Sequence, residues 1–433
     1  MANHVTLGTA YRFFMPLILM TELNMISKSV INAVLARSPD QSVTLAAFHL
    51  AFILYFALSS STEVGSLITL AYLKTKRSLR PLLRFMIVIV AVPWGVAQVL
   101  AFTDLGDWVY GGIFGASQPV VLQAKIATFI LSLSAPILII RSICFGLILM
   151  HQRTIFITYA TLVRFVSLAG SLVLLPRFFT GASIGAVALV VCMTVEMIVA
   201  LAFARGLFRG LPRGEGVSTS DPIFRRQWRF SWPLMLNASS EMGVVVAISI
   251  FLGRLPNPDL ALAAFNIIYG LVCVLMSPMR NLMQTAQAIV KSINDRRPLF
   301  VFALHLTFFF GLIGIVLFHT PLEKFVLADL MGLQVELRYY CLPALKLAFL
   351  MSVVWAYSAL FRGLLAGVKN TMMLAASGLS RIAVAVLVSS VGIGIAQVSG
   401  PVIGIVGWMA GYALEATLLA IHLKSLDRRQ GKR

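Results

Sequence analysis

The sequence predicts an all-α polytopic membrane protein of twelve transmembrane helices, built as two parallel six-helix repeats. Of its 433 residues, 59% are hydrophobic and only 12% are charged, and the mean hydropathy is +0.91, which is outside the range of soluble domains. Charge-free runs such as 85–103, 298–322 and 382–414 meet or exceed the roughly 20 residues that cross a bilayer core. An alignment of the sequence with itself, shifted by 217 residues, indicates the repeat.

The individual spans follow from hydrophobic runs between polar breaks. In the first half we expect helices at residues 12–36, 43–73, 82–103, 121–150, 155–176 and 181–205. In the second half we expect them at residues 227–253, 260–290, 298–319, 338–367, 372–395 and 401–423. The stretch 206–224, rich in Gly, Pro, Ser and Arg, is typical of a linker. The predicted domains are therefore an N-terminal bundle (1–205), a cytoplasmic linker (206–224) and a C-terminal bundle (225–433).

The distribution of the 35 lysines and arginines predicts the orientation. The loops on the side of the two termini carry 22 of them, and the loops on the opposite side carry six. Because positive charge in short loops stays on the cytoplasmic side, both termini are expected in the cytoplasm of a plasma membrane, the inner membrane of a bacterium. This clustering also explains the net charge of +19 without a nucleic-acid partner.

The internal repeat appears when the sequence is shifted by 217 residues. Leu45, Ala46, Ala47 and Phe48 then meet the identical run 262–265, and the motif that begins at Tyr11 meets the one that begins at Trp228. Because six spans per copy give both copies the same orientation, the repeats are parallel, related by an axis along the membrane normal. Substrate sites in such proteins lie near the midplane, where the halves face each other.

Charged residues inside predicted spans are costly, at about 2.5 to 3.5 kcal/mol each at a helix centre, so each needs a partner or water. Arg164 and Glu196 fall at the same depth of neighbouring helices, and Arg381 and Glu415 repeat the arrangement. We interpret these as two structural ion pairs.

The other intramembrane charges break the repeat, as a specific ligand would require. Lys28 meets Val245, Arg141 meets Ser358, and Glu63 meets Arg280. Polar residues spaced three and four apart also give single polar faces to the first, second, seventh and eighth helices. The candidate substrate-binding residues are Asn24, Lys28, Glu63, Asn237, Glu241, Tyr269, Ser277, Arg280 and Gln284. Two alternatives stay open: a structural Glu63–Arg280 pair, and polar faces that only satisfy one another.

Motifs for other chemistry are absent from the sequence. It contains no P-loop, HExxH, CxxC or nucleophile elbow, and its six histidines are scattered. The four cysteines lie in or beside apolar segments. We therefore expect no catalytic residues, no metal site, no cofactor and no enzymatic activity.

Several short motifs resemble the multidrug/oligosaccharidyl-lipid/polysaccharide (MOP) exporter superfamily, and within it the progressive-ankylosis (ANK) family. They are KTKR at 74–77, TDLGDWVY at 103–110, FSWPL at 230–234 and RGLLAGVKNTMM from Arg362. The resemblance implies a MATE-like V-shaped bundle whose cavity is lined by the first, second, seventh and eighth helices. It also implies that Lys28 and Arg280 neutralise a substrate that Asn24, Asn237 and Gln284 bind by hydrogen bonds.

The function expected from this resemblance is secondary active export of a small organic or phosphate-containing anion, such as citrate, ATP or pyrophosphate, by alternating access. Three alternatives remain: a flippase for a lipid-linked saccharide, a cation-coupled multidrug exporter that uses Glu22, Glu63 and Glu241 as proton or Na⁺ carriers, and a non-transporting scaffold. The expected partners are the small anion, membrane lipids and a coupling H⁺ or Na⁺, and the chain is expected to be a monomer.

Overall fold

The structure is a computed structural model that describes residues 6–62, 65–151, 153, 155–212, 223–290, 296–367, 371–394 and 399–430. Within these ranges the chain is helical and contains no strand. Ten of the helical segments are long and apolar enough to cross a membrane. Two further helices, α1 and α10, contain the shorter apolar segments Met25–Leu35 and Ala238–Leu252. The chain is therefore an all-α integral membrane protein, as the sequence predicts.

The helices of the first half match the predicted spans to within a few residues. Their bounds are α1 Leu7–Leu35, α2 Gln41–Ser59, α3 Gly65–Tyr72, α4 Leu79–Phe102, α6 Gln118–Ser132, α7 Ser134–Met150, α8 Ile155–Leu174 and α9 Ser183–Arg209. The TDLGDWVY motif forms the short helix α5 (Asp104–Asp107) and the start of a π-helix (Trp108–Ile113) between α4 and α6.

The second half follows the same order. Its bounds are α10 Ile223–Leu252, α11 Pro258–Met276, α12 Asn281–Ile289, α13 Arg296–His319, α14 Leu322–Lys324, α15 Val335–Leu347, α16 Met351–Gly367, α17 Thr371–Ile393 and α18 Gly400–Gln430. Helix α18 continues seven residues beyond the predicted end at 423, into the basic C-terminal segment.

The shift of 217 residues holds for the helices themselves. Helices α2, α4 and α7 coincide with α11, α13 and α16 at both ends under this shift. It also places the π-helix Trp108–Ile113 on the π-helix Phe325–Leu330. Gly115 and Gly332, which share the shift, both have a positive φ (65° and 69°), a conformation that favours glycine. The repeat thus extends to the connections between spans.

Four predicted helices are interrupted by short turns. A 3-10 turn at Ser277–Arg280 separates α11 from α12, and a 3-10 turn at Ser60–Thr62 follows α2 at the equivalent position. In the second half Pro278 explains the break, because it lacks a backbone N–H and its ring clashes with the preceding turn. In the first half the Ser60 and Thr62 hydroxyls donate to the carbonyl oxygens of Ala57 and Ser59, which competes with the helix ladder. Similar turns separate α6 from α7 and α15 from α16.

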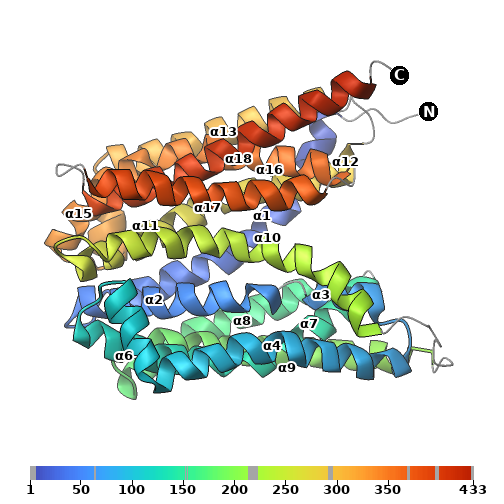
Figure 1. Ribbon diagram of the computed structural model, residues 1–433, viewed down its shortest axis with the longest axis horizontal. Coiled ribbons are helices and arrows are strands. Elements are labelled where there is room, and N and C mark those ends of the chain that lie inside the picture. Colours follow the sequence, from blue (N-terminus) through green and yellow to red (C-terminus); the bar gives the residue numbers. More distant parts are fainter. Residues whose placement is uncertain are drawn as a thin grey trace. The chain divides into compact units, whose positions relative to one another are not determined.

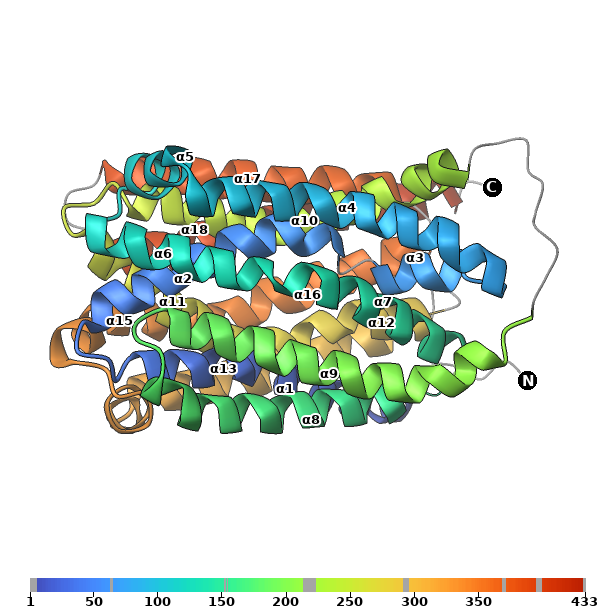
Figure 2. The same cartoon turned by 90° about the horizontal axis from the view of Figure 1, so that it is seen from below.

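The chain divides into two compact units by its internal contacts. Unit 1 comprises residues 1–37 and 247–433, and unit 2 comprises residues 38–246. Helix α1 thus groups with α11, α12 and α13 of the second repeat, and most of α10 groups with the first. Within unit 1, α18 packs against α16 and α17 (Figure 1). Within unit 2, α9 packs in the same way against α7 and α8 (Figure 2).

The predicted domains follow the sequence repeat, whereas these units follow contacts. The predicted boundary near residues 206–224 therefore stays a prediction. The ends of that stretch are helical, since α9 continues to Arg209 and α10 begins at Ile223, and residues 213–222 lie outside the described ranges.

Candidate functional site

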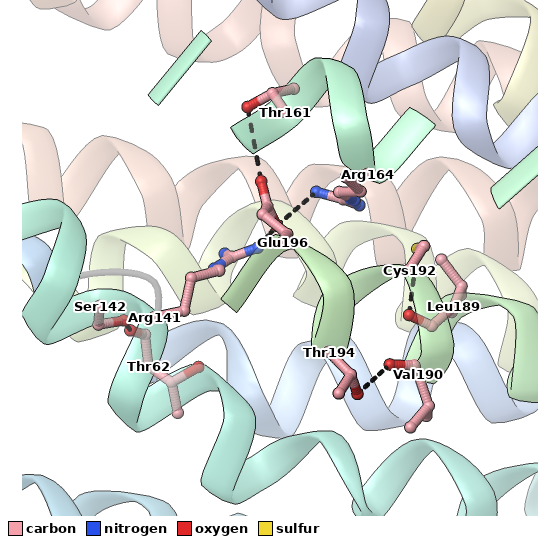
Figure 3. Close-up of polar contacts among 10 residues, drawn as sticks. All are labelled: Thr62, Arg141, Ser142, Thr161, Arg164, Leu189, Val190, Cys192, Thr194 and Glu196. Atoms are coloured by element: carbon pink, nitrogen blue, oxygen red, sulfur yellow. Dashed lines mark hydrogen bonds and ion pairs between the residues drawn. The ribbon is translucent and has the colours of Figure 1, made fainter. Parts of the chain in front are cut away.

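Both predicted ion pairs are present. In unit 2 an Arg164 Nη1 lies 3.5 Å from Glu196 Oε2, and in unit 1 an Arg381 Nη1 lies 3.2 Å from Glu415 Oε2. Figure 3 shows the first pair, with the Thr161 hydroxyl donating to Glu196 Oε1 at 3.5 Å. Both carboxylates are almost completely buried. The prediction of these pairs from depth and repeat position is confirmed.

Arg141 corrects the interpretation that charges breaking the repeat are available to a ligand. Its guanidinium donates to Glu196 Oε2 at 2.8 Å, a closer contact than that of Arg164 (Figure 3). In the other unit Ser358, at the equivalent position, donates to Glu415 Oε2 at 2.8 Å. The two residues differ in type and have the same partner. Residue types at equivalent positions of a repeat do not reveal a shared contact, because that contact depends on how the helices pack.

The second arginine of unit 1 is displaced along its helix. Arg362 Nε lies 4.0 Å from Glu415 Oε1, and its equivalent in the first repeat is Phe145, over whose ring the Arg141 guanidinium lies. Residues 141 and 145 are four apart on α7, which is about one helical turn. Each unit therefore places two guanidiniums around one buried carboxylate, which we assign to the stability of the bundle.

Lys28 and Tyr269, two predicted site residues, meet in the core of unit 1. Lys28 Nζ, on α1, lies 4.0 Å from the centroid of the Tyr269 ring on α11. Lys28 is 8% exposed and Tyr269 is 7% exposed. A desolvated ammonium over an aromatic face gains about 2 kcal/mol, which offsets part of the cost of its burial.

Three aromatic residues that the sequence analysis missed extend this contact. Trp408 of α18 stacks on Tyr269 with centroids 5.2 Å apart, and Trp355 of α16 meets Trp408 edge-on at 5.5 Å. Tyr412 meets Trp355 at 5.7 Å. We call these four rings, Tyr269, Trp355, Trp408 and Tyr412, the aromatic cluster. The signal for the three missed rings was available in the repeat, because non-aromatic residues occupy their corresponding positions in the first half.

Arg280 contacts the same cluster. Its Cζ lies 5.5 Å from the centroid of the Trp355 ring. Arg280 ends the 3-10 turn that interrupts α11 and α12, so the turn sets where its guanidinium lies. The two predicted cations of this unit are thus joined through Tyr269, Trp408 and Trp355.

The same turn carries Ser277, another predicted site residue. The Ser277 hydroxyl donates to Glu22 Oε1 of α1 at 3.3 Å, and Glu22 is half-buried. Further along this pair of helices, Asn266 Nδ2 donates to Asn32 Oδ1 at 3.0 Å, and both side chains are fully buried. The predicted polar faces of the first and eighth helices therefore pack against each other within unit 1. The alternative in which they satisfy one another applies to Asn32 and Asn266.

The structure describes the side chain of only one of the five remaining candidate residues, Glu241. Glu63 lies outside the described ranges, and so do the side chains of Asn24, Asn237 and Gln284. Glu241 is half-buried on α10 in unit 2. The proposed pairing of Glu63 with Arg280 stays a prediction.

Comparisons with known proteins bear on the fold. No protein-family model matches the sequence. A MATE family multidrug resistance transporter of the MOP superfamily, in an inward-facing conformation, aligns with a TM-score of 0.69 at 14% identity, over 94% of this chain and 96% of that one. The eukaryotic MATE transporter AtDTX14 aligns with a TM-score of 0.62 at 14% identity, over 96% and 95% of the two chains.

A MOP superfamily transporter from Pyrococcus furiosus, described as having a binding pocket of reverse polarity, aligns with a TM-score of 0.59. Its identity is 14%, and the alignment covers 98% of this chain and 97% of that one. At 14% identity, these structural alignments establish the fold alone. The finer likeness to the progressive-ankylosis family stays a prediction. The chain therefore has the all-α fold of the MATE transporters of the MOP superfamily.

Proposed function

We propose that this protein is a secondary active transporter that exports a small organic or phosphate-containing anion by alternating access. The observation that carries the proposal is the pair of cations, Lys28 and Arg280, set around the aromatic cluster in unit 1. Membrane-embedded cations are costly, and those kept away from the lipid usually mark a pathway for a substrate or ion. The likeness in fold to transporters supports the reaction type.

The chemistry of the two cations favours an oxyanion. A guanidinium cannot be deprotonated at physiological pH, and when it lies over a ring its N–H donors remain in its own plane. That geometry matches the two oxygens of a carboxylate or phosphate group. An ammonium adds a point charge with three donors. Together they would hold a di- or trivalent anion more tightly than a monovalent one.

Glu22 fits this arrangement as a modulating charge. With Lys28 and Arg280 charged and Glu22 ionised, these three groups of unit 1 carry a net charge of +1. Protonation of Glu22 would remove its negative charge and leave the two cations unopposed by it. Uptake of a proton by this carboxylate would therefore favour binding of an anion.

A cation-coupled multidrug exporter is the second candidate. It is favoured by Glu22, a half-buried carboxylate that accepts a hydrogen bond from Ser277 beside a helix break. Intramembrane carboxylates of this kind carry protons or Na⁺ in transporters. One solved structure of similar fold is described as a MATE multidrug transporter in a ligand complex, which supports this candidate by analogy.

Flux measurements separate the two candidates. The full-length protein would be reconstituted in liposomes, and the fluxes of labelled citrate, labelled pyrophosphate and the organic cation ethidium would be compared. Replacing Arg280 or Lys28 by Gln removes a charge-assisted hydrogen bond, so we expect anion flux to fall about 10- to 100-fold. Arg254→Gln is the matched control, because Arg254 also lies over an aromatic ring, that of Phe251, but is exposed in a loop.

If anion flux is undiminished in folded Arg280→Gln protein while ethidium flux disappears in Glu22→Gln protein, the second candidate replaces the first. Monodisperse elution in detergent and an unchanged helical circular-dichroism signal would establish that each variant is folded.

A further inference from the structure

One end of unit 2 carries a concentration of positive charge that the proposed function does not use. Here α3 ends, α4 begins, α7 leads into α8, α9 ends and α10 begins. Eleven lysines and arginines lie on these described segments: five from Lys74 to Arg84, then Arg153, Arg205, Arg209, and three from Arg225 to Arg229. We call this surface the basic end. No carboxylate lies on these described segments, and Glu215 and Asp221 fall outside the described ranges.

Tertiary contacts gather these segments, which are far apart in the sequence. The Lys76 backbone N–H donates to the Pro212 carbonyl oxygen at 3.0 Å, which ties the loop before α4 to the residues after α9. The Tyr72 hydroxyl donates to the Arg226 carbonyl oxygen at 3.0 Å, which ties α3 to α10. These two contacts hold the start of α4, the end of α9 and the start of α10 to neighbouring segments of the same unit.

The first turns of α10 give this surface a second property. Gln227 and Ser231, one turn apart, are buried and face the bundle. On the same turns the chain exposes Arg225, Arg226 and Arg229. Four large aromatic side chains on the same turns are 41% to 48% exposed: Phe224, Trp228, Phe230 and Trp232. Phe224 and Phe230 contact the rings of Phe85 and Tyr72, so Trp228 and Trp232 are the large rings beside the three exposed arginines that make no ring contact within the described residues.

This combination fits the boundary between lipid headgroups and acyl chains. Tryptophan is enriched at that depth, because its ring is apolar and its N–H can still reach a polar partner. Clusters of arginine beside a span attract anionic headgroups, with about a five-fold gain in affinity per charge. A solution anion would gain from the arginines but would leave the exposed rings in water.

We propose that the basic end binds the headgroup phosphate of anionic phospholipids. Arg225, Arg226 and Arg229 contact the phosphate, and Trp228 and Trp232 lie against the upper acyl chain. A guanidinium can engage two phosphate oxygens at once, which gives a phosphate a geometric preference beyond net charge. The inference stands apart from the transport reaction, since none of these residues belongs to the cation and aromatic site of unit 1.

A quenching titration with the purified full-length protein tests this proposal. Phosphatidylglycerol with brominated acyl chains quenches nearby tryptophans, and brominated phosphatidylcholine is the neutral comparison. We expect phosphatidylglycerol to bind at least ten-fold more tightly than phosphatidylcholine. The triple variant Arg225→Gln, Arg226→Gln, Arg229→Gln should lose about five-fold per charge, or roughly a hundred-fold, and so lose the preference.

Two further variants protect the result from a folding artefact. The triple Arg-to-Lys variant keeps the charge and should keep most of the preference for phosphatidylglycerol over phosphatidylcholine. Any loss of that preference measures how much the two-oxygen contact of each guanidinium with the phosphate adds to net charge. Arg177→Gln removes an exposed arginine from the opposite end of unit 2 and should change nothing.

Three results would overturn the proposal. One is equal binding of the two lipids by the unmodified protein. Another is a phosphatidylglycerol preference that survives in the triple Gln variant. The third is displacement of the lipid by inorganic phosphate at comparable concentration, which would make the surface a site for free anions.

Discussion

At the scale of single residues, both repeats place two arginines beside one buried glutamate, although one of the two arginines is not at the equivalent sequence position. Glu196 has Arg141 and Arg164 beside it, and Glu415 has Arg362 and Arg381. One arginine of each set is in register with its counterpart, and the other has moved four residues along the equivalent helix. A carboxylate buried in a membrane bundle needs donors around it, and helical geometry allows them to approach from either of two turns.

This relocation can be tested by building the arrangement of one repeat into the other. Arg141→Ser removes the 2.8 Å charged hydrogen bond to Glu196, which should cost about 2 kcal/mol and lower the apparent Tm by several degrees. Adding Phe145→Arg places a guanidinium where the second repeat has Arg362, and should recover more than half of the loss. Thermal unfolding in detergent measures both changes.

The control for this pair is Phe145→Arg alone, which puts three guanidiniums around one carboxylate and should be less stable than the double variant. A double variant no more stable than Arg141→Ser would show that the two positions are not interchangeable.

At the scale of secondary-structure elements, the interruption between α11 and α12 decides the local geometry of the site. A continuous helix would rotate the residues after Met276 by the ordinary 100° per residue, whereas the 3-10 turn changes both rise and rotation. Ser277 and Arg280 lie in that turn and contact Glu22 and Trp355. Interrupted helices occur at binding sites in membrane transporters because unwound backbone is tolerated only where protein or a cavity covers it.

Pro278→Ala should therefore separate stability from transport. Restoring the backbone N–H lets the helix close, which we expect to stabilise the protein by about 1 kcal/mol while the flux through the site falls several-fold. Thermal unfolding and liposome flux on the same preparation give the two readouts.

Pro258→Ala is the matched control, since Pro258 begins α11, where its missing N–H leaves no bond unmade. Unchanged flux together with a lower Tm in Pro278→Ala would contradict this assignment of the turn.

At the scale of the whole molecule, the distribution of lysine and arginine predicts the topology. The basic end of unit 2 lies on the side predicted to be cytoplasmic, and Arg177 lies on the other. The positive-inside bias gives the two ends different compartments. The four native cysteines are buried, so the background of labelling by a thiol reagent should be low.

Cysteine labelling in intact cells tests this orientation. A membrane-impermeant maleimide should label Arg177→Cys directly and should label Arg77→Cys only after the cells are permeabilised. Both positions are exposed, so they serve as each other's control. The reverse pattern would invert the predicted topology.

The positions of the apolar helices, to within a few residues at most ends, and the 217-residue repeat were predictable from hydropathy and self-alignment alone. Ten of the twelve predicted spans correspond to helical segments long and apolar enough to cross a membrane, while α1 and α10 contain shorter apolar segments. Hydropathy is a local property of the chain, and lipid admits few structures other than helices, so these features need no knowledge of packing. The pairing of Arg164 with Glu196 and of Arg381 with Glu415 was also predictable, because depth in neighbouring helices fixes which charges can meet.

The contacts between helix faces follow from the tertiary structure. It joined Arg141 to the carboxylate of Glu196, Lys28 to Tyr269, and Arg280 to Trp355. It also added Trp355, Trp408 and Tyr412. Their departure from the repeat is visible in the sequence, but hydropathy alone does not separate these rings from the other apolar residues of a chain that is 59% hydrophobic. These contacts join residues tens to hundreds of positions apart, and they depend on rotations of helices and on the turn at Pro278. The periodicity of residues within one helix determines neither how that helix is rotated against its neighbours nor where the turn at Pro278 places the residues that follow it.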